Sequence, residues 1–145
     1  MSLFDSLTIS ASGMSAQRVR AELLVQNMAN AETTRTPEGG PYRRQDVVFA
    51  PAEAPAPFAD AFRLALGPGE AGVRVDEIVV DDREPELRYL PGHPDANADG
   101  YVAFPRVNPA EDMVDLLNAS RGFQANVSAM SAVKHMIQRS LDLLR

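Results

Sequence analysis

Apolar side chains recur at seven-residue steps in two segments without proline, residues 1–36 and 110–145, one at each end of the chain. Over residues 108–145 the apolar row is Leu116, Phe123, Met130, Ile137 and Leu144. A strict seven-residue repeat favours a left-handed supercoiled seam over a straight isolated helix. Asn108 can cap this helix, and Pro109 suits its first position. The pattern therefore predicts one long C-terminal helix that packs against a second helix.

The N-terminal segment over residues 1–36 repeats this pattern more weakly. Its row is Leu7, Met14, Ala21 and Met28, with Leu24 beside it. Gly13 lowers the helix propensity by about 1 kcal/mol relative to alanine, and Asn30 is suited to end the helix. We expect the two segments to pair with each other.

Residues 37–107 form a middle region in which turns and short strands alternate. All 11 prolines of the chain lie between Pro37 and Pro109. Residues 50–57 alternate alanine and proline closely enough to suggest an extended, polyproline-like strip. Short apolar or alternating runs predict strands, and they lie at 73–75, 78–80, 87–90 and 101–104, the last two paired with each other.

The fold class expected from these patterns is mainly α with a small β-containing middle. The N- and C-terminal helices would pair as a coiled-coil-like helical domain, with a Pro/Gly-rich loop and short-strand insertion between them. The organisation expected is an N-terminal helical arm over 1–36, an acidic middle over 37–107 and a heptad helix over 108–145.

Composition narrows the function classes. The chain has 145 residues, with 14 Lys and Arg against 20 Asp and Glu, a net charge of −6 that falls entirely in the middle region. This charge argues against a nucleic-acid binder that neutralises phosphates. With no cysteine, disulfides and thiolate zinc sites are excluded. No run approaches the roughly 20 apolar residues of a membrane span, and we expect no secretory signal peptide.

The motifs with possible chemistry are weak. Asp95, Asn97 and Asp99 imitate the opening of an EF-hand calcium loop, but the twelfth position is Arg106 where the ion needs a carboxylate. An Asx-rich turn is the better interpretation. The glycines at 67–72 match G-x-G-x-x-G without the helix that a phosphate needs. We therefore predict no catalytic residue, no metal and no cofactor.

The predicted helices carry unusually little charge on their remaining faces, where serine, asparagine and glutamine predominate. One interpretation is a monomer whose helices form an antiparallel hairpin with these polar residues in water. The other is that the helices also pack against neighbouring subunits, where bulky charged side chains would be excluded. The low charge favours the second interpretation.

Several segments together resemble the flagellar rod and hook protein family. The resemblance is carried by residues 9–18, 26–34, 36–44, 92–102, 111–114 and 119–126. The later segments are similar to the short proximal rod members in particular. Small departures from the family pattern lie at Gln26, Arg106 and Phe123.

This resemblance implies a non-enzymatic structural subunit of the bacterial flagellar basal-body rod, which assembles helically and transmits torque. It implies export by the flagellar type III apparatus without a cleaved signal peptide, and a location in the rod as it crosses the periplasm. The partners implied are other rod proteins, further copies of the chain and the hook–basal body protein FliE, with no nucleic acid and no membrane span.

The residues expected at packing and subunit interfaces belong to the two apolar rows and to the amides beside them. They are Leu7, Met14, Ala21, Leu24, Asn27, Met28, Asn30, Leu116, Phe123, Gln124, Asn126, Met130, Ile137 and Leu141. Two rival hypotheses stay open. One is a soluble helical-hairpin adaptor that binds a partner helix, and the other is a small hydrolase that uses the aspartates of the middle region.

Overall fold

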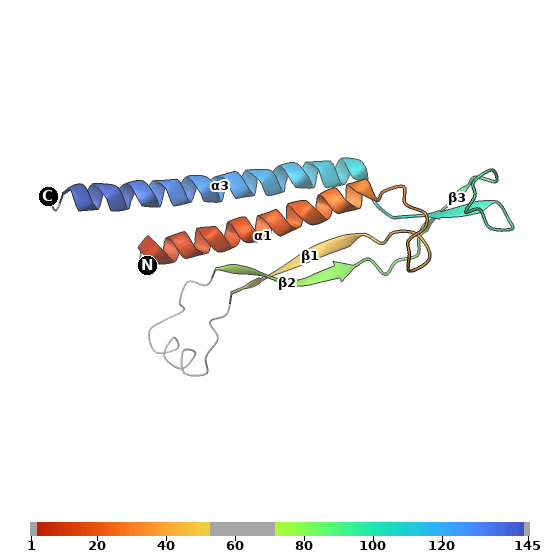
Figure 1. The fold of residues 1–145 in the computed structure, drawn as a ribbon, viewed down its shortest axis with the longest axis horizontal. Coiled ribbons are helices and arrows are strands. Elements are labelled where there is room, and N and C mark those ends of the chain that lie inside the picture. The colour runs from red at the N-terminus through yellow and green to blue at the C-terminus, as the bar shows by residue number, and fades with distance from the viewer. Residues whose placement is uncertain (1–2, 53–71, 144–145) are drawn as a thin grey trace, which may run out of the picture.

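The computed structural model describes residues 3–52 and 72–143. Its elements, in chain order, are α1 (Leu3–Ala29), β1 (Gln45–Pro51), β2 (Val73–Val80), β3 (Glu86–Tyr89), β4 (Tyr101–Phe104) and α3 (Pro109–Asp142). Figure 1 shows an elongated molecule in which the two long helices run side by side in opposite directions. The expected fold class, two end helices around a small β-containing middle, is confirmed.

Both helix boundaries follow local signals in the sequence. Asn108 caps α3, since its side-chain oxygen accepts a hydrogen bond of 3.2 Å from the Ala110 N–H, and Pro109 occupies the first turn as predicted. At the other boundary, α1 ends at Ala29, and the Asn30 side chain donates to the Gln26 carbonyl at 2.9 Å. These ends place the start of α3 beside the end of α1.

The helix α1 is the central layer of the molecule. It packs against α3 on one side and against the two-stranded sheet of β1 and β2 on the other (Figure 1). The longer helix, α3, continues past the first turn of α1, so its last turns have no helix beside them (Figure 1). We call residues 136–143 of α3 and its cap the overhang.

The β1–β2 sheet differs in part from the expectation. Strands were predicted at 73–75 and 78–80, and the structure joins them into the single strand β2. Its antiparallel partner β1 was not predicted, and its last residues, Ala50 and Pro51, were wrongly assigned to a polyproline-like strip. Residues 53–57 of that strip lie outside the described residues. Proline disfavours a strand because it has no N–H to donate, but Pro51 is the last residue of β1, where the pairing with β2 tolerates it.

The strands β3 and β4 form a separate antiparallel pair at the far end of the molecule (Figure 1), in confirmation of the predicted pairing. We call residues 84–104 the finger. Val102 and Phe104 point to the covered face of the finger and are 1% and 8% exposed. The Arg88 guanidinium lies 4.8 Å above the Phe104 ring, a cation–π contact that helps to cover that ring.

Candidate functional site

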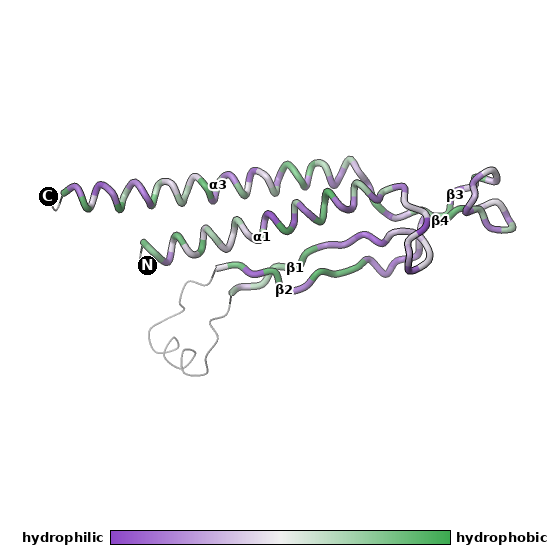
Figure 2. The backbone as a smooth tube through the Cα atoms, viewed as in Figure 1, coloured by the Kyte–Doolittle hydropathy of each residue, from purple (hydrophilic) through white to green (hydrophobic). Residues whose placement is uncertain are grey.

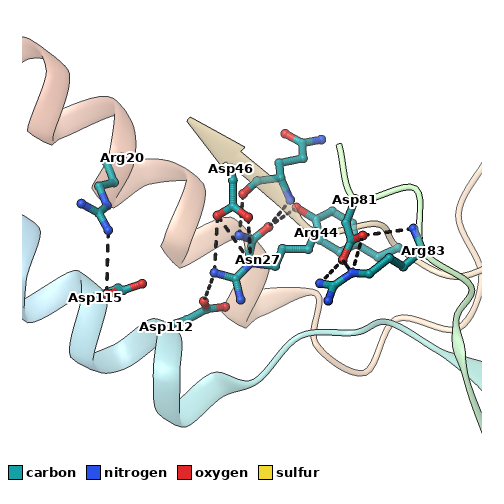
Figure 3. Close-up of polar contacts among 10 residues, drawn as sticks. Arg20, Asn27, Arg44, Asp46, Asp81, Arg83, Asp112 and Asp115 are labelled. Carbon is teal, nitrogen blue, oxygen red and sulfur yellow. Dashed lines mark hydrogen bonds and ion pairs between the residues drawn. The ribbon is translucent and has the colours of Figure 1, made fainter. Parts of the chain in front are cut away.

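The end of α1 is fixed to the start of β1 by one buried amide. Asn27 is 0% exposed, and its Nδ2 donates to the Gln45 carbonyl at 2.8 Å. Its Oδ1 accepts from the Gln45 N–H at 3.0 Å and from the Tyr42 hydroxyl at 2.9 Å (Figure 3). The side chain thus pairs with a strand backbone as a neighbouring strand would. This arrangement sets the angle at which the chain leaves the helix.

An ion pair joins the same junction to α3. Arg44 Nη2 lies 3.0 Å from Asp112 Oδ1, and Arg44 Nε lies 3.2 Å from Asp46 Oδ2 (Figure 3). Asp112 is 0% exposed, and among the described residues neither of its carboxylate oxygens has a hydrogen-bond donor in good geometry. Burial therefore raises the pKa of the Asp112 carboxyl, and the positive charge of Arg44 opposes that shift only in part.

The seam between the two helices is made of small and polar residues. A Cβ added to Gly13 would lie 3.0–3.2 Å from the Asn126 side chain, and one added to Gly122 would lie 3.2–3.4 Å from Gln17. Ala119 is 1% exposed. Since a glycine in one helix faces an amide in the other at two successive levels, the backbones approach closely without bulky residues between them.

The bulky apolar residues of α3 lie beside this seam rather than in it. Leu117 is 55% exposed, Phe123 39% and Val127 40%. Figure 2 shows hydrophobic residues recurring along the whole length of α3. We call the row Leu116, Leu117, Phe123 and Val127 the outer stripe.

A groove of about 520 Å³ runs between the outer stripe and α1. Its lining residues are Gln17, Arg18, Ala21, Leu116, Leu117, Ala119, Ser120 and Phe123. Ala21, Leu116 and Phe123, three of the residues predicted from the sequence, therefore meet at one surface. This groove is the strongest candidate for a functional site in the described residues, because it is apolar and open to a partner.

The other residues predicted from the sequence differ in how far they are buried. Leu24 and Asn27 are buried, and the half-buried residues are Leu7, Met14, Ala21, Met28, Asn30, Leu116, Asn126, Met130 and Ile137. Phe123, Gln124 and Leu141 are exposed, so within a single chain Phe123 is not part of the paired core in which it was expected. The reason is that the two helices approach most closely where α3 has the small residues Ala119 and Gly122, which leaves the bulky side chains beside the contact. As contacts between subunits, all of these residues stay predictions.

Sequence reasoning included Asn27 at the junction and Asn126 in the seam, but it missed Arg44, Asp112 and the packing role of the two glycines. The Arg44–Asp112 pair joins positions far apart in the chain, and no local pattern signals it. Gly13 and Gly122, by contrast, had a signal: a glycine inside a strong helical pattern often marks a close packing contact.

The aspartates of the finger form a turn. Asn97 Oδ1 accepts hydrogen bonds from the Asp99 N–H at 3.0 Å and the Tyr101 N–H at 2.8 Å, and Asp95 Oδ2 accepts from the Thr34 hydroxyl at 2.8 Å. The Asx-rich turn is thus confirmed. Within residues 3–52 and 72–143, no cluster of three potential metal ligands is found, and no helix has the length and apolarity of a membrane span.

Comparison with known proteins gives a consistent result. A family model described as the flagellar basal body rod FlgEFG protein C-terminal region matches residues 98–143. The chain is 41% identical over 153 residues to a flagellar basal-body rod protein FlgC of Borreliella burgdorferi, covering 100% of this chain and 99% of that protein. It is 40% identical to the FlgC of Bacillus subtilis, over 99% of both chains. Against the FlgC of Escherichia coli O157:H7 the identity is 36%, over 99% of this chain and 98% of that protein.

Proposed function

Given that the chain belongs to the FlgC family of flagellar basal-body rod proteins and is a structural subunit of that rod, we propose that the groove is its assembly surface. A helix of a neighbouring subunit would lie in the groove against Phe123 and Leu117. Repetition of this contact around the rod axis would build a helical wall that transmits torque through shared helix packing.

The observation that supports this proposal is that different residues of α3 contact α1 and face the solvent. Where the helices approach most closely, α3 contributes the small residues Ala119 and Gly122, and Val133 is its one large apolar residue that is buried in the described part of the chain, whereas Leu117, Phe123 and Val127 stay exposed. Burying apolar surface contributes about 25 cal/mol per Å². The large side chains next to the apolar groove remain partly exposed in the single chain. Burial of this exposed surface by a partner would therefore stabilise a complex.

The proposal extends to partners and location. We place other rod proteins, further copies of this chain and FliE in contact with the two helices, and the subunit in the rod as it crosses the periplasm after type III export. Membership of the rod family supports this extension. A mechanical role of this kind requires no catalytic residue, metal or cofactor.

Phe123→Lys tests the groove directly, because it places a charge where a neighbouring helix would pack. Basal bodies are isolated from cells that carry the variant in place of the natural chain, and peptide mass spectrometry measures the ratio of this chain to other rod subunits. We expect the variant to be lost from basal bodies. In the purified chain its unfolding free energy should fall by no more than about 2 kcal/mol, since the residue is 39% exposed and the long stem of a lysine can cover part of the same apolar surface.

Ala125→Lys is the matched control, since it adds the same charge two residues away, on the opposite side of the helix and outside the groove lining. This variant should enter basal bodies at the natural ratio. Full incorporation of Phe123→Lys would refute the groove as the assembly surface. Recovery of the natural chain only in a soluble complex of fixed stoichiometry would favour the adaptor instead.

A further inference from the structure

The β1–β2 sheet is also joined to α1 far from the Asn27 junction, at the end of the sheet nearest the N-terminus of α1 (Figure 1). Ser12 Oγ accepts a hydrogen bond of 3.0 Å from the Val73 N–H, and it donates one of 2.7 Å to the Ile9 carbonyl. The hydroxyl thus uses its donor within the helix and its acceptor on the strand. One serine therefore connects the start of β2 to α1.

Gly72 permits this contact because it has no side chain. A Cβ added to Gly72 would overlap the Ser12 hydroxyl and would lie 3.1 Å from Ser12 Cβ and 3.8 Å from Ile9 Cα. The Gly72 carbonyl also accepts a hydrogen bond of 2.7 Å from the Ala52 N–H, which continues the pairing of the two strands. The backbone at residue 72 therefore lies directly against the helix, and a side chain there would push the strand away from it.

Ser12 and Asn27 hold opposite corners of the sheet. Asn27 binds Gln45 at the start of β1, and Ser12 binds Val73 at the start of β2. In the antiparallel register these two strand residues lie at opposite ends of the pair. The two helix positions are separated by about four turns, or about 22 Å, and so face the same side of α1. Two contacts this far apart prevent the sheet from rotating about either one.

Between these two contacts the sheet packs loosely on the helices. A cavity of about 290 Å³ lies there, and its lining includes Leu23 and Leu24 of α1 with Val47 and Phe49 of β1. Protein interiors are normally closely packed, and that packing fixes how one element lies on another. Because the packing is incomplete here, the polar contacts at the two corners determine more of the position of the sheet.

We infer that Ser12 and Gly72 are positioning residues that hold the β1–β2 sheet at one angle to the helix pair. Without their contact the sheet would pivot about the Asn27 junction. A helical assembly repeats one contact from subunit to subunit, so every copy has to present its surfaces in the same relation. The inference concerns the shape of the single subunit and does not depend on the groove, which Phe123→Lys tests separately.

Spin labels can measure this angle because the natural chain has no cysteine to interfere with the labelling. One label pair, Arg74→Cys/Ser128→Cys, connects the Ser12 end of the sheet to α3. A second pair, Val79→Cys/Ser128→Cys, connects the Asn27 end to α3. All three positions are exposed. Pulsed electron paramagnetic resonance on the purified full chain gives the distribution of distances within each pair.

Gly72→Ala should shift the distance from residue 74 to longer values and broaden it, whereas the distance from residue 79 should change little. Ser12→Ala should increase the population at longer distance about fivefold, as expected for the loss of one hydrogen bond. The double variant should resemble Gly72→Ala alone, because both changes open the same contact and their effects are not additive.

The matched controls are Ser15→Ala and Gly92→Ala. Ser15 is an exposed serine of the same helix, and a Cβ added to Gly92 would meet nothing within 4 Å. Both controls should leave the two distance distributions as they are in the natural background. An unchanged distance from residue 74 in Ser12→Ala and Gly72→Ala, or equal broadening at residues 74 and 79, would overturn the inference. Ser12→Ala alone decides the question where Gly72→Ala does not fold, because it removes a single oxygen atom.

Discussion

The junction around Asn27 and the distal half of α3 show opposite uses of buried and exposed surface. At the junction, two polar side chains, Asn27 and Asp112, are fully buried and held by an arginine, a tyrosine and strand backbone (Figure 3). Along the distal half of α3, large apolar residues such as Val127, Met136 and Leu141 are exposed. In these two regions polar side chains are buried and apolar side chains are exposed, which is the reverse of the usual arrangement.

This difference indicates what each region specifies. A buried amide with three satisfied hydrogen bonds adds only modestly to stability, yet it excludes other arrangements, because any of them would leave its partners unpaired. The exposed apolar residues of α3 keep a large part of their surface outside the packing of the single chain. One region therefore fixes the shape of the subunit, and the other is available for contacts between subunits.

Removing the Asn27 side chain should cause the largest loss of stability. Asn27→Ala leaves the Gln45 N–H, the Gln45 carbonyl and the Tyr42 hydroxyl without their partner, and each unsatisfied buried group costs about 1–3 kcal/mol. We expect the unfolding free energy of the purified chain to fall by about 3 kcal/mol in urea titration.

Asn30→Ala is the control for this loss. The Asn30 side chain is half-buried and donates to a carbonyl of its own helix, so the change should cost about 0.5 kcal/mol. Equal losses in the two variants would mean that the junction does not depend on the Asn27 hydrogen bonds.

A bulkier residue in the seam should have the next largest effect. Gly13→Val would force its side chain against the Asn126 amide, which a Cβ alone already approaches to 3.0 Å. Overpacking of this kind costs about 1–3 kcal/mol, and the better helix propensity of valine returns only a few tenths. Thermal unfolding followed by circular dichroism should show a clear decrease in Tm. Ala11→Val, two residues away at an exposed position, should change Tm little.

The seam also shows how far the sequence alone could lead. The seven-residue repeat predicted both helices and their pairing because periodicity is a local signal. It placed the centre of the seam at bulky residues such as Phe123, since apolar size dominates any such pattern. In the structure the seam centres on Gly122 and Ala119, so α3 turns a different side toward α1 than the pattern predicted. The only sequence signal for this difference was a glycine inside a helix.

The sheet and the junction illustrate a different limit. The pairing of β3 with β4 was predictable because both strands are short, alternating and separated by a turn-rich segment. The strand β1 was missed because its last residues run into proline and alanine, and its partner β2 follows only after a long intervening segment. The Arg44–Asp112 pair depends on how the helices meet, which no stretch of neighbouring residues encodes.

The smallest effects should come from two aspartates whose pKa values shift in opposite directions. Hydrogen bonds from Arg83 lower the pKa of Asp81 to about 2. The stability that Asp81 contributes is therefore present above its ordinary pKa and is lost as pH falls from about 4 to about 2. Burial raises the pKa of Asp112, so in a window above its ordinary pKa the folded chain binds more protons than the unfolded chain, and stability falls as pH rises.

Asparagine substitutions separate the two contributions in urea unfolding between pH 2 and pH 7. Asp81→Asn should lower the unfolding free energy at pH 7 by about 1 kcal/mol, a modest value because water screens the pair with Arg83. That difference should vanish near pH 2. Asp112→Asn should raise stability at pH 7 by up to about 1 kcal/mol, since it removes a buried charge while Asp46 still pairs with Arg44. A loss of several kcal/mol in Asp112→Asn would instead show that the ion pair, and not the amide of Asn27, holds the helices at the junction.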